Sequence, residues 1–456
     1  MQDSEPRAAR VAEPPTSAGN GRGAASRGAL RDVAPWFIAV AVVLVLPHVP
    51  WLASNSARSL LSQMGIAAIF ALSYNMLLGQ TGLLSFGHAV YFGVGGFAAI
   101  HFMRAINAGL GVPMPLVPLV GAAAGLAFGL VFGALTTRRS GVVFALISLG
   151  VGELVHAAAG ILQSISGGEG GISANRALGP HPLGLTFASQ LQVYYIVAVW
   201  ALLSALLMFG FTRTAVGRMC NAVRDNPERA AFIGYSTQGV RFIVFSVAAT
   251  FAGLAGGLHA INYEIVGVDA LGAARSGSVL LMVYIGGESH FLGAVLGAIV
   301  ITWLQVSLSD YTNAWQLYLG LFFMAIVLYA PGGLTGLIMM HVPIARTRAF
   351  AALLRSYAVA LVPALASMAG AVALLEINYR LSTQPEAGPG MKLFGVVVDT
   401  STPWPWLVAA LLAVGGFLLF RATWPMIAAA RQRALDEALA ARRAGEGAPQ
   451  VTGVAP

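Results

Sequence analysis

The sequence predicts an all-α membrane protein: a polytopic transmembrane helix bundle with broken or re-entrant helices and about 10–12 spans. Three observations support this fold class. Of the 456 residues, 57% are apolar and only 10% are charged, whereas soluble domains carry roughly 25% charged residues. Apolar runs of about 18 residues or more, enough to cross ~30 Å of hydrocarbon, recur along most of the chain. No polar stretch between them is long enough for a separate soluble domain.

Composition divides the chain into four regions. Residues 1–33 are rich in Ala, Gly, Pro and Arg without an apolar face, so we expect a disordered tail. No cleavable signal peptide is evident, because the first apolar run begins only after Ala34. Residues 34–340 form the main transmembrane domain, 341–421 an additional transmembrane region, and 422–456 an Arg-rich cytoplasmic tail.

The apolar runs define twelve candidate spans. In chain order they are 36–52, 60–78, 83–103, 115–135, 142–162, 191–211, 242–261, 276–287, 291–308, 316–329, 357–376 and 404–420. The run 276–287 is too short to cross alone at about 1.5 Å per residue. We therefore expect a broken or half helix there, buried among its neighbours.

Arginine residues set the expected orientation. The net charge of +8 comes almost wholly from Arg, since Lys392 is the only lysine. With the N-terminus inside, twelve crossings place all the Arg clusters on one face, as the positive-inside rule requires. Both termini are then cytoplasmic. Because the basic residues flank apolar runs, lipid is the expected partner and nucleic acid is not.

Two segments are interrupted by glycine at membrane depth. The first runs from Gly79 to Gly96 and the second from Tyr284 to Gly293. Either small residues allow close helix contact, or interrupted helices line a pathway. On the second interpretation the candidate pathway residues are Gly82, Ser85, Phe86, His88, Gly286, Gly287 and Glu288.

One further ionisable residue is a pathway candidate. Glu153 stands three residues before His156 on a predicted helix, where the two side chains share a face. They either pair with each other or lie in the pathway, because buried ionisable groups in membranes are costly and often functional.

The sequence lacks the common motifs of catalysis. A phosphate-binding loop needs Gly-Lys followed by Ser or Thr, but Lys392 is followed by Leu393. No Gly-x-Ser-x-Gly elbow sits at a strand-to-helix turn and no His-Glu-x-x-His occurs. The histidines are scattered, and a single cysteine, Cys220, excludes an internal disulfide. We expect no enzyme activity, metal or cofactor on this chain.

A short helix is expected between two spans, on the cytoplasmic side. Pro227 suits the first turn of a helix, Glu228 complements its positive N-terminus, and Gly234 can end it. The plain alternative is an ordinary interfacial loop helix.

This segment resembles a known family. Glu228-x-Ala230-x-x-x-Gly234 has the spacing of the EAA loop of ABC-importer permeases, with Arg229 in place of an alanine. The surrounding chain resembles the LivM-type permeases of branched-chain amino acid importers. Segment 79–88, Gly-x-x-Gly-x-x-Ser-Phe-Gly-His, looks like a family element, and segments 145–153, 166–171, 246–257, 286–297 and 331–334 fit in the same order. The resemblance covers roughly 60–337, but not 1–32 and not clearly 345–456.

The resemblance implies a permease subunit of the bacterial inner membrane. It pairs with a second related permease, receives solute from an external binding protein, and docks on ATP-binding cassette subunits that carry ATP and Mg. The implied ATPase-coupling residues are Arg224, Asp225, Glu228, Ala230 and Gly234. The implied substrate is a branched-chain amino acid or a similar small solute, with urea, short amides and small carboxylates as alternatives. An ion-coupled secondary carrier or channel is the alternative from another class.

Overall fold

The computed structural model describes residues 36–180, 184, 186–345, 349–383 and 390–445. The predicted tail 1–33 lies outside these residues, as do Arg346 and Arg348. Helices dominate the described chain, and its strands form only two short antiparallel pairs. The predicted all-α fold class is confirmed.

The helices follow one another along the chain, with a long loop between α6 and α7. After a first apolar helix, Trp36–His48, the α-helices are α2 (Asn55–Thr81), α3 (Ala89–Asn107), α4 (Val117–Thr136), α5 (Gly141–Ile161), α6 (Gln163–Ser166), α7 (Gln190–Arg213), α8 (Ala215–Asp225), α9 (Pro227–Phe232), α10 (Thr237–Tyr263), α11 (Ala273–Gly286), α12 (Phe291–Tyr311), α13 (Trp315–Tyr329), α14 (Gly333–Ile344), α15 (Phe350–Thr383) and α16 (Pro403–Gly445). The 3-10 turns are η1 (Leu46–His48), η2 (Pro50–Leu52), η3 (Met114–Leu116), η4 (Gly168–Gly170) and η6 (Val268–Leu271). The strands are β1 (Ile172–Ser173), β2 (Ile265–Val266), β3 (Gly390–Leu393) and β4 (Val396–Asp399).

The lengths of these helices agree with the predicted number of spans. In the described part of the chain, 9 helices are long and apolar enough to cross a membrane. The pair α13 and α14, bent by 46°, makes a tenth, and two shorter apolar helices, Trp36–His48 and α11, complete the set. The expected range of about 10–12 spans is therefore confirmed, including the broken helices.

Several predicted boundaries were wrong. The span expected over 83–103 begins only at Ala89, because residues 82–88 leave the helix. The first span is helical only to His48 and continues as the 3-10 turn η2, where two prolines interrupt the helix. Helix α14 follows α13 after Gly332 and was not predicted.

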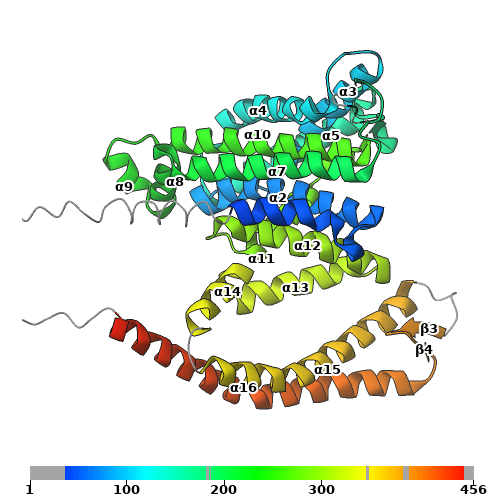
Figure 1. Cartoon of the computed structure of the whole chain (residues 1–456), viewed down its shortest axis with the longest axis vertical. Helices are drawn as coiled ribbons and strands as arrows, with labels where there is room; N and C mark the ends of the chain where they lie inside the picture. The colour runs from blue at the N-terminus through cyan, green and yellow to red at the C-terminus, as the bar shows by residue number, and fades with distance from the viewer. Residues whose placement is uncertain (1–35, 181–183, 185, 346–348, 384–389, 446–456) are drawn as a thin grey trace, which may run out of the picture.

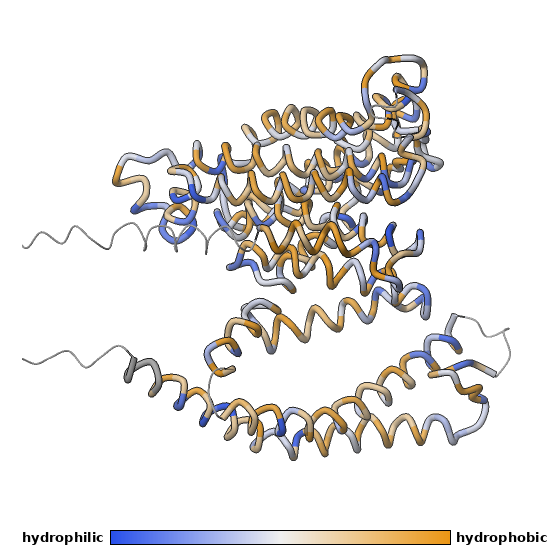
Figure 2. The backbone as a smooth tube through the Cα atoms, in the orientation of Figure 1, coloured by the Kyte–Doolittle hydropathy of each residue, from blue (hydrophilic) through white to orange (hydrophobic). Residues whose placement is uncertain are grey.

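The bundle has two ends of different chemistry. One end, which we call the arginine-rich end, carries α8 and α9, the C-termini of α4 and α7, and the N-termini of α5 and α10. It carries the arginines Arg138, Arg139, Arg213, Arg218, Arg224, Arg229 and Arg241. At the opposite end, β1 pairs with β2. Figure 2 shows the apolar helices between these ends.

Both ends of the described chain lie at the arginine-rich end (Figure 1). Trp36 packs on Phe209 near the C-terminus of α7, with ring centroids 5.5 Å apart. His48, at the other end of the first helix, is 2.8 Å from the Tyr195 hydroxyl near the N-terminus of α7. Helix α16 starts at the opposite end and finishes at the same end as α8 and α9 (Figure 1). The described chain therefore begins and finishes at the same end of the bundle.

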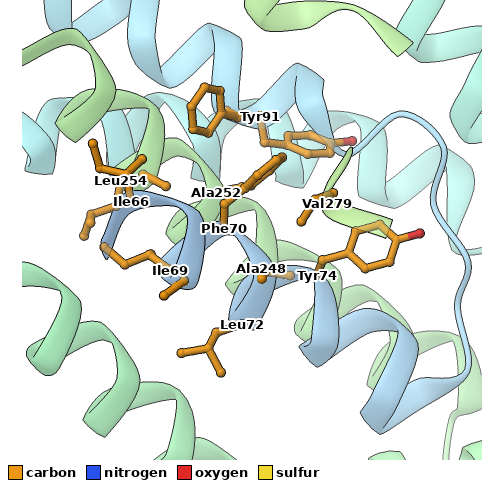
Figure 3. Packing of buried hydrophobic residues seen from close by; sticks show 14 of the residues in the cluster. Ile66, Ile69, Phe70, Leu72, Tyr74, Tyr91, Ala248, Ala252, Leu254 and Val279 are labelled. Carbon is orange, nitrogen blue, oxygen red and sulfur yellow. The ribbon is translucent and has the colours of Figure 1, made fainter. Parts of the chain in front are cut away.

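Helix α10 forms the centre of the bundle, packed against α2, α3 and α4. Figure 3 shows the apolar contacts there, with side chains from α2, α3, α10 and α11 meeting in one cluster. Glycines bring the backbones close: a Cβ at Gly253 would lie 2.8 Å from Gly125 Cα in α4 and would overlap Gly121 O. Gly95 in α3 has as little room against Gly253. Small residues thus allow close helix packing, as in other membrane bundles.

We expect Gly253→Val to prevent normal folding. Overpacking typically costs about 1–3 kcal/mol, and here the added atoms would meet backbone that cannot rotate away. Gly150→Val is the matched control, because α5 leaves open space around Gly150. Thermal unfolding of the detergent-purified chains should show a large loss for Gly253→Val and little change for Gly150→Val. Equal stability of the two variants would contradict this packing.

Helix α11 is the short helix that the sequence predicted over 276–287. Its 14 residues span about 21 Å at 1.5 Å per residue. The chain first leaves α10 through β2 and η6, and η6 packs against α3 inside the bundle. Helix α11 then runs to the arginine-rich end, packed on α12 and α2. The η6–α11 segment therefore crosses the bundle as one broken span, as expected.

Arg176 fixes the long loop at the opposite end. Its backbone N–H donates to Glu264 Oε1 at 2.8 Å, and its guanidinium donates to the Asn262 carbonyl at 3.0 Å and the Phe187 carbonyl at 3.1 Å. Glu264 follows the last residue of α10 with a positive φ of 58°. This polar anchor, together with the β1–β2 pair, ties the loop to the end of α10.

Helices α15 and α16 form a separate hairpin below the main bundle (Figure 1). Gly370 and Gly416 allow their backbones to approach, and Tyr318 of α13 donates a 2.7 Å hydrogen bond to Glu376 of α15. Helix α16 continues to Gly445, through the boundary predicted at residue 421.

Candidate coupling surface and pathway

Helices α8 and α9 are two capped helices at the arginine-rich end. Thr214 Oγ1 accepts from the Gly217 N–H at 3.2 Å and starts α8. Asn226 Oδ1 accepts from the Arg229 N–H at 2.9 Å, and Pro227 is the first residue of α9. Sequence reasoning found the helix start at Pro227 but missed Asn226, although Asn before a first-turn Pro is a recognised cap signal.

Gly234 ends this segment through its conformation. Its φ is +92°, a region that favours glycine, and no described atom lies within 4 Å of the position that a Cβ would take. Its N–H donates to the Ala231 carbonyl at 2.9 Å, and the Tyr235 N–H donates to the Ala230 carbonyl at 3.1 Å. These bonds satisfy carbonyls that a helix end leaves free.

Helix α9 divides into a buried and an exposed side. Ala230 is 1% exposed, whereas Phe232 is 91%, Ile233 64% and Tyr235 45% exposed. We call Phe232, Ile233 and Tyr235 the α9 patch. Glu228 is also exposed, in the first turn. Large exposed apolar side chains at the polar end of a protein make this segment a candidate interaction surface.

Arg224 connects α8 to the break after α2. Its Nη1 donates to the Gly79 carbonyl, and its Nε donates to Asp225 Oδ1 at 3.1 Å. Its stem lies beside Gly82, where an added Cβ would be 3.2 Å from Arg224 Cγ. Gly82 ends α2 with a φ of 68°. Hydrogen bonds from charged donors are stronger than neutral ones, so α8 and the end of α2 are held together.

Glu288 joins this group from a third element. It is exposed in the turn between α11 and α12, and its carbonyl lies against Gly79. The surrounding protein displaces water and raises the pKa of the Glu288 carboxyl, while the Arg224 guanidinium opposes that rise. The structure therefore brings Gly82, Arg224 and Glu288 together at the arginine-rich end.

The glycines before Glu288 are packing residues. A side chain on Gly286 would overlap the Gly293 carbonyl, and one on Gly287 would lie 2.5 Å from the Gly332 carbonyl. Gly287 also has a φ of +107°. The second glycine-rich segment thus makes close contacts among α11, α12 and α14, and its place beside a pathway stays a prediction.

The first glycine-rich segment is a true helix interruption. Residues 82–88 are not helical, and serines of other helices bond to the backbone at this break. The Phe86 N–H donates to Ser148 Oγ of α5, and the Ala89 N–H donates to Ser276 Oγ of α11, both at 3.0 Å. Irregular backbone inside a membrane needs such protein partners. Sequence reasoning missed Ser148 and Ser276, whose signal is a serine within an apolar run.

Ser85 and His88 are buried beside this interruption. Ser85 is 1% exposed, and its hydroxyl has no hydrogen-bond partner in the described chain. His88 is 0% exposed, with Nε2 2.9 Å from Ser73 Oγ and its ring stacked 5.4 Å from Phe70. His88 therefore lies in the packed aromatic core.

Glu153 lies apart from the other pathway candidates. Its side chain is exposed on α5, and no hydrogen bond or ion pair joins it to His156 in the described chain. His156 instead faces the start of α11, where its Cε1 would be 3.7 Å from a Cβ on Gly272. Of the two alternatives for Glu153, the structure does not show the pair with His156, and a place in the pathway stays a prediction; the adjacent Gly152 does contact Gly87.

Cys220 is a buried residue of α8. Its thiol donates to the Val216 carbonyl at 3.0 Å, and burial raises its pKa to about 11. Among the described residues, no three His, Cys, Asp or Glu side chains lie close enough to hold a metal ion.

These features define a class: a multi-pass helical membrane protein with broken helices and a capped, exposed apolar helix at one end. The chain belongs to the family described as the permease component of the branched-chain amino acid transport system, which matches residues 56–331. The match covers most of the predicted main domain and excludes the α15–α16 hairpin.

Individual relatives are consistent with this membership. The high-affinity branched-chain amino acid transport system permease protein LivM of Salmonella typhimurium is 25% identical over 318 residues, 65% of this chain and 73% of the relative. LivM of Escherichia coli gives the same values. The fructose import permease protein FruF of Bifidobacterium longum is 26% identical over 212 residues, 44% of this chain and 57% of the relative. No solved structure matches the chain significantly.

Proposed function

We propose that this chain is the membrane-spanning subunit of an ATP-binding-cassette importer in a bacterial inner membrane. Its arginine-rich end faces the cytoplasm, because basic residues are retained on that side, and both termini are cytoplasmic. ATP and Mg are bound by separate ATPase subunits. A second related permease and an external solute-binding protein complete the importer.

The α9 patch is the observation that carries this proposal. Phe232, the last residue of α9, is 91% exposed and Ile233, which follows it, is 64% exposed, while Ala230 on the other side of the helix is buried. A rigid helix with exposed apolar side chains fits the cleft of a partner protein. Asn226, Pro227 and Gly234 fix the two ends of the segment, so a push on it would be passed on without bending.

Arg224 would transmit movement of α9 to the helices of the bundle. It bonds the carbonyl of Gly79 and lies beside Gly82, where α2 ends and the interruption begins. Movement of α8 and α9 would therefore act on residues 82–88, and through the bonds to Ser148 and Ser276 on α5 and α11. Rigid movement of this kind exchanges access between two sides of a membrane.

The transport pathway is proposed to follow the interruption. Gly82, Ser85, Phe86 and His88 lie on it, while Gly286, Gly287 and Glu288 adjoin it at the cytoplasmic end. The exposed Glu153 on α5 would then face the second permease. The proposed substrate is a branched-chain amino acid, supported by the LivM relatives. Relatives of this chain differ in solute, since one is a fructose import permease.

Reconstitution tests the function. The chain, its second permease and the ATPases are placed in liposomes with the binding protein, and uptake of radioactive leucine is measured. We expect uptake only with ATP on the ATPase side. Leucine accumulation by the chain alone, driven by an ion gradient without ATP, would instead identify a secondary carrier.

A further inference from the structure

A cavity lined by both polar and apolar side chains lies in the bundle next to the interruption, since its lining residue Phe70 stacks on His88. It has a volume of about 160 Å³ and is lined by α2, α3, α10, α11 and α12. Its size is below the several hundred Å³ of drug-sized pockets, so it suits a small solute. The apolar part of the lining is formed by Ile66, Ala67, Phe70, Phe92 and Met282. The polar part is formed by Arg275 with Gln63, His259, Tyr263, Ser278, Thr302 and Gln305.

Arg275 lies over an aromatic ring and has no carboxylate within salt-bridge distance in the described chain. Its guanidinium carbon lies 5.0 Å from the centre of the Phe92 ring, and no hydrogen bond or salt bridge of its side chain is found in the described chain. Asp269 attracts it from a longer distance, without an ion pair. A cation within a membrane bundle that no carboxylate neutralises is costly, and such residues are often functional.

The position of Arg275 on its helix adds to this cost. It lies in the first turn of α11, where the helix dipole is positive, and Gly272 supplies no side-chain cap. Cations are unfavourable at a helix N-terminus and anions are favourable. The Arg275 guanidinium and the positive end of the α11 dipole therefore both favour a negatively charged ligand at this point of the cavity.

The other polar groups also offer donors. Ser278 Oγ accepts from Gln305 Nε2 at 3.2 Å, which leaves the Ser278 O–H free to donate. Thr302 Oγ1 is buried without a hydrogen-bond partner among the described residues. No carboxylate of the described chain lines the cavity, so a cationic group would find no counter-charge there. A carboxylate accepts about four hydrogen bonds and pairs with the planar fork of arginine.

We propose that this cavity binds a small carboxylate with a short hydrocarbon tail. Arg275 holds the carboxylate, Ser278 and Thr302 donate hydrogen bonds, and Phe70 and Met282 contact the tail. The apolar wall favours such an ion over inorganic phosphate or chloride. The site lies within one subunit, so binding requires neither the second permease nor an ATPase and goes beyond the proposed function.

Titration of the purified full chain in detergent tests the site. The probe is sodium isovalerate, and isovaleramide is its neutral isostere of the same shape. We expect isovalerate to bind and to raise the unfolding temperature, and isovaleramide to bind at least about tenfold more weakly, as expected for loss of a charged hydrogen bond. Equal binding of the amide, no binding of isovalerate, or equal competition by phosphate or chloride would overturn the proposal.

Two variants locate the binding. Arg275→Gln should weaken isovalerate binding about tenfold or more, whereas Arg104→Gln, which removes an exposed arginine of α3, should not change it. Ser278→Asp places a carboxylate three residues after Arg275 on the same helix face, where it can pair with the guanidinium. It should abolish isovalerate binding in a stably folded chain, even if Arg275→Gln does not fold. Unchanged binding in Ser278→Asp would contradict the assignment.

Discussion

Replacing Phe232 by aspartate should abolish assembly of this chain with its ATPase. Phe232 is the most exposed residue of the α9 patch, at 91%, and a central aromatic side chain at an interface often contributes about 2 kcal/mol or more. Such a loss weakens association by about 30-fold, and the introduced charge would be desolvated in the partner's cleft. Co-purification of ATPase with the tagged chain measures the effect.

The control for this variant is Tyr311→Asp. Tyr311 is 89% exposed, so the two aromatic side chains are matched in exposure, but it ends α12 at the opposite end of the bundle. We expect Tyr311→Asp to retain the ATPase, and both variants to insert normally in the membrane. Full ATPase recovery with Phe232→Asp would show that the patch is an ordinary interfacial loop.

Replacing Arg224 by glutamine should uncouple ATP hydrolysis from transport. The side chain would lose its charged hydrogen bond to the Gly79 carbonyl and its contact with Asp225. A hydrogen bond to a charged group contributes about 1.5–3 kcal/mol. Its loss would lower the equilibrium constant for contact between α8 and the end of α2 by about tenfold or more. Because the α9 patch is unchanged, the ATPase should still bind. Leucine uptake per ATP hydrolysed, measured in proteoliposomes, should fall about tenfold.

Arg218→Gln is the matched control for Arg224. It removes the same charge from the same helix, but Arg218 is exposed and has no hydrogen bond to the interruption in the described chain. We expect near-normal uptake from Arg218→Gln. If both variants transport equally well, the link from α8 to Gly79 and Gly82 does not carry the movement.

The sequence predicted the helices well, because apolar length is a direct consequence of bilayer thickness. It also predicted that segment 276–287 would be a broken helix, since twelve residues cannot span the hydrocarbon core. Boundaries within the bundle were harder. The start of α3 at Ala89 depends on Ser148 and Ser276, two residues far away in sequence, whose contacts no local pattern contains.

The candidate site was predicted unevenly for the same reason. The ends of α9 follow local rules for Pro227 and Gly234, so they could be read directly. The hydrogen bond from Arg224 to Gly79 joins residues 145 positions apart. No local sequence pattern predicts it, so only the structure could show it. Helix spacing left open whether Glu153 pairs with His156, because spacing permits a contact but does not require it; in the structure His156 lies beside Gly272 at the start of α11.

The natural sequence has no exposed cysteine to which a site-directed probe could be attached. The one cysteine, Cys220, is buried, and its pKa of about 11 keeps it protonated and unreactive near neutral pH. A cysteine placed at residue 232 would therefore be the accessible thiol of the described chain. This permits a cross-linker to be attached at the centre of the α9 patch.

In the proposed mechanism, an ATPase pushes on α9 from the cytoplasm. The most direct measurement is cross-linking from Phe232→Cys in the native host, followed by mass spectrometry of the product. We predict a cross-link to a polypeptide that contains a nucleotide-binding Gly-Lys-Ser or Gly-Lys-Thr loop. A cross-link to an extracytoplasmic protein, or labelling of residue 232 from outside the cell by a membrane-impermeant maleimide, would contradict the account.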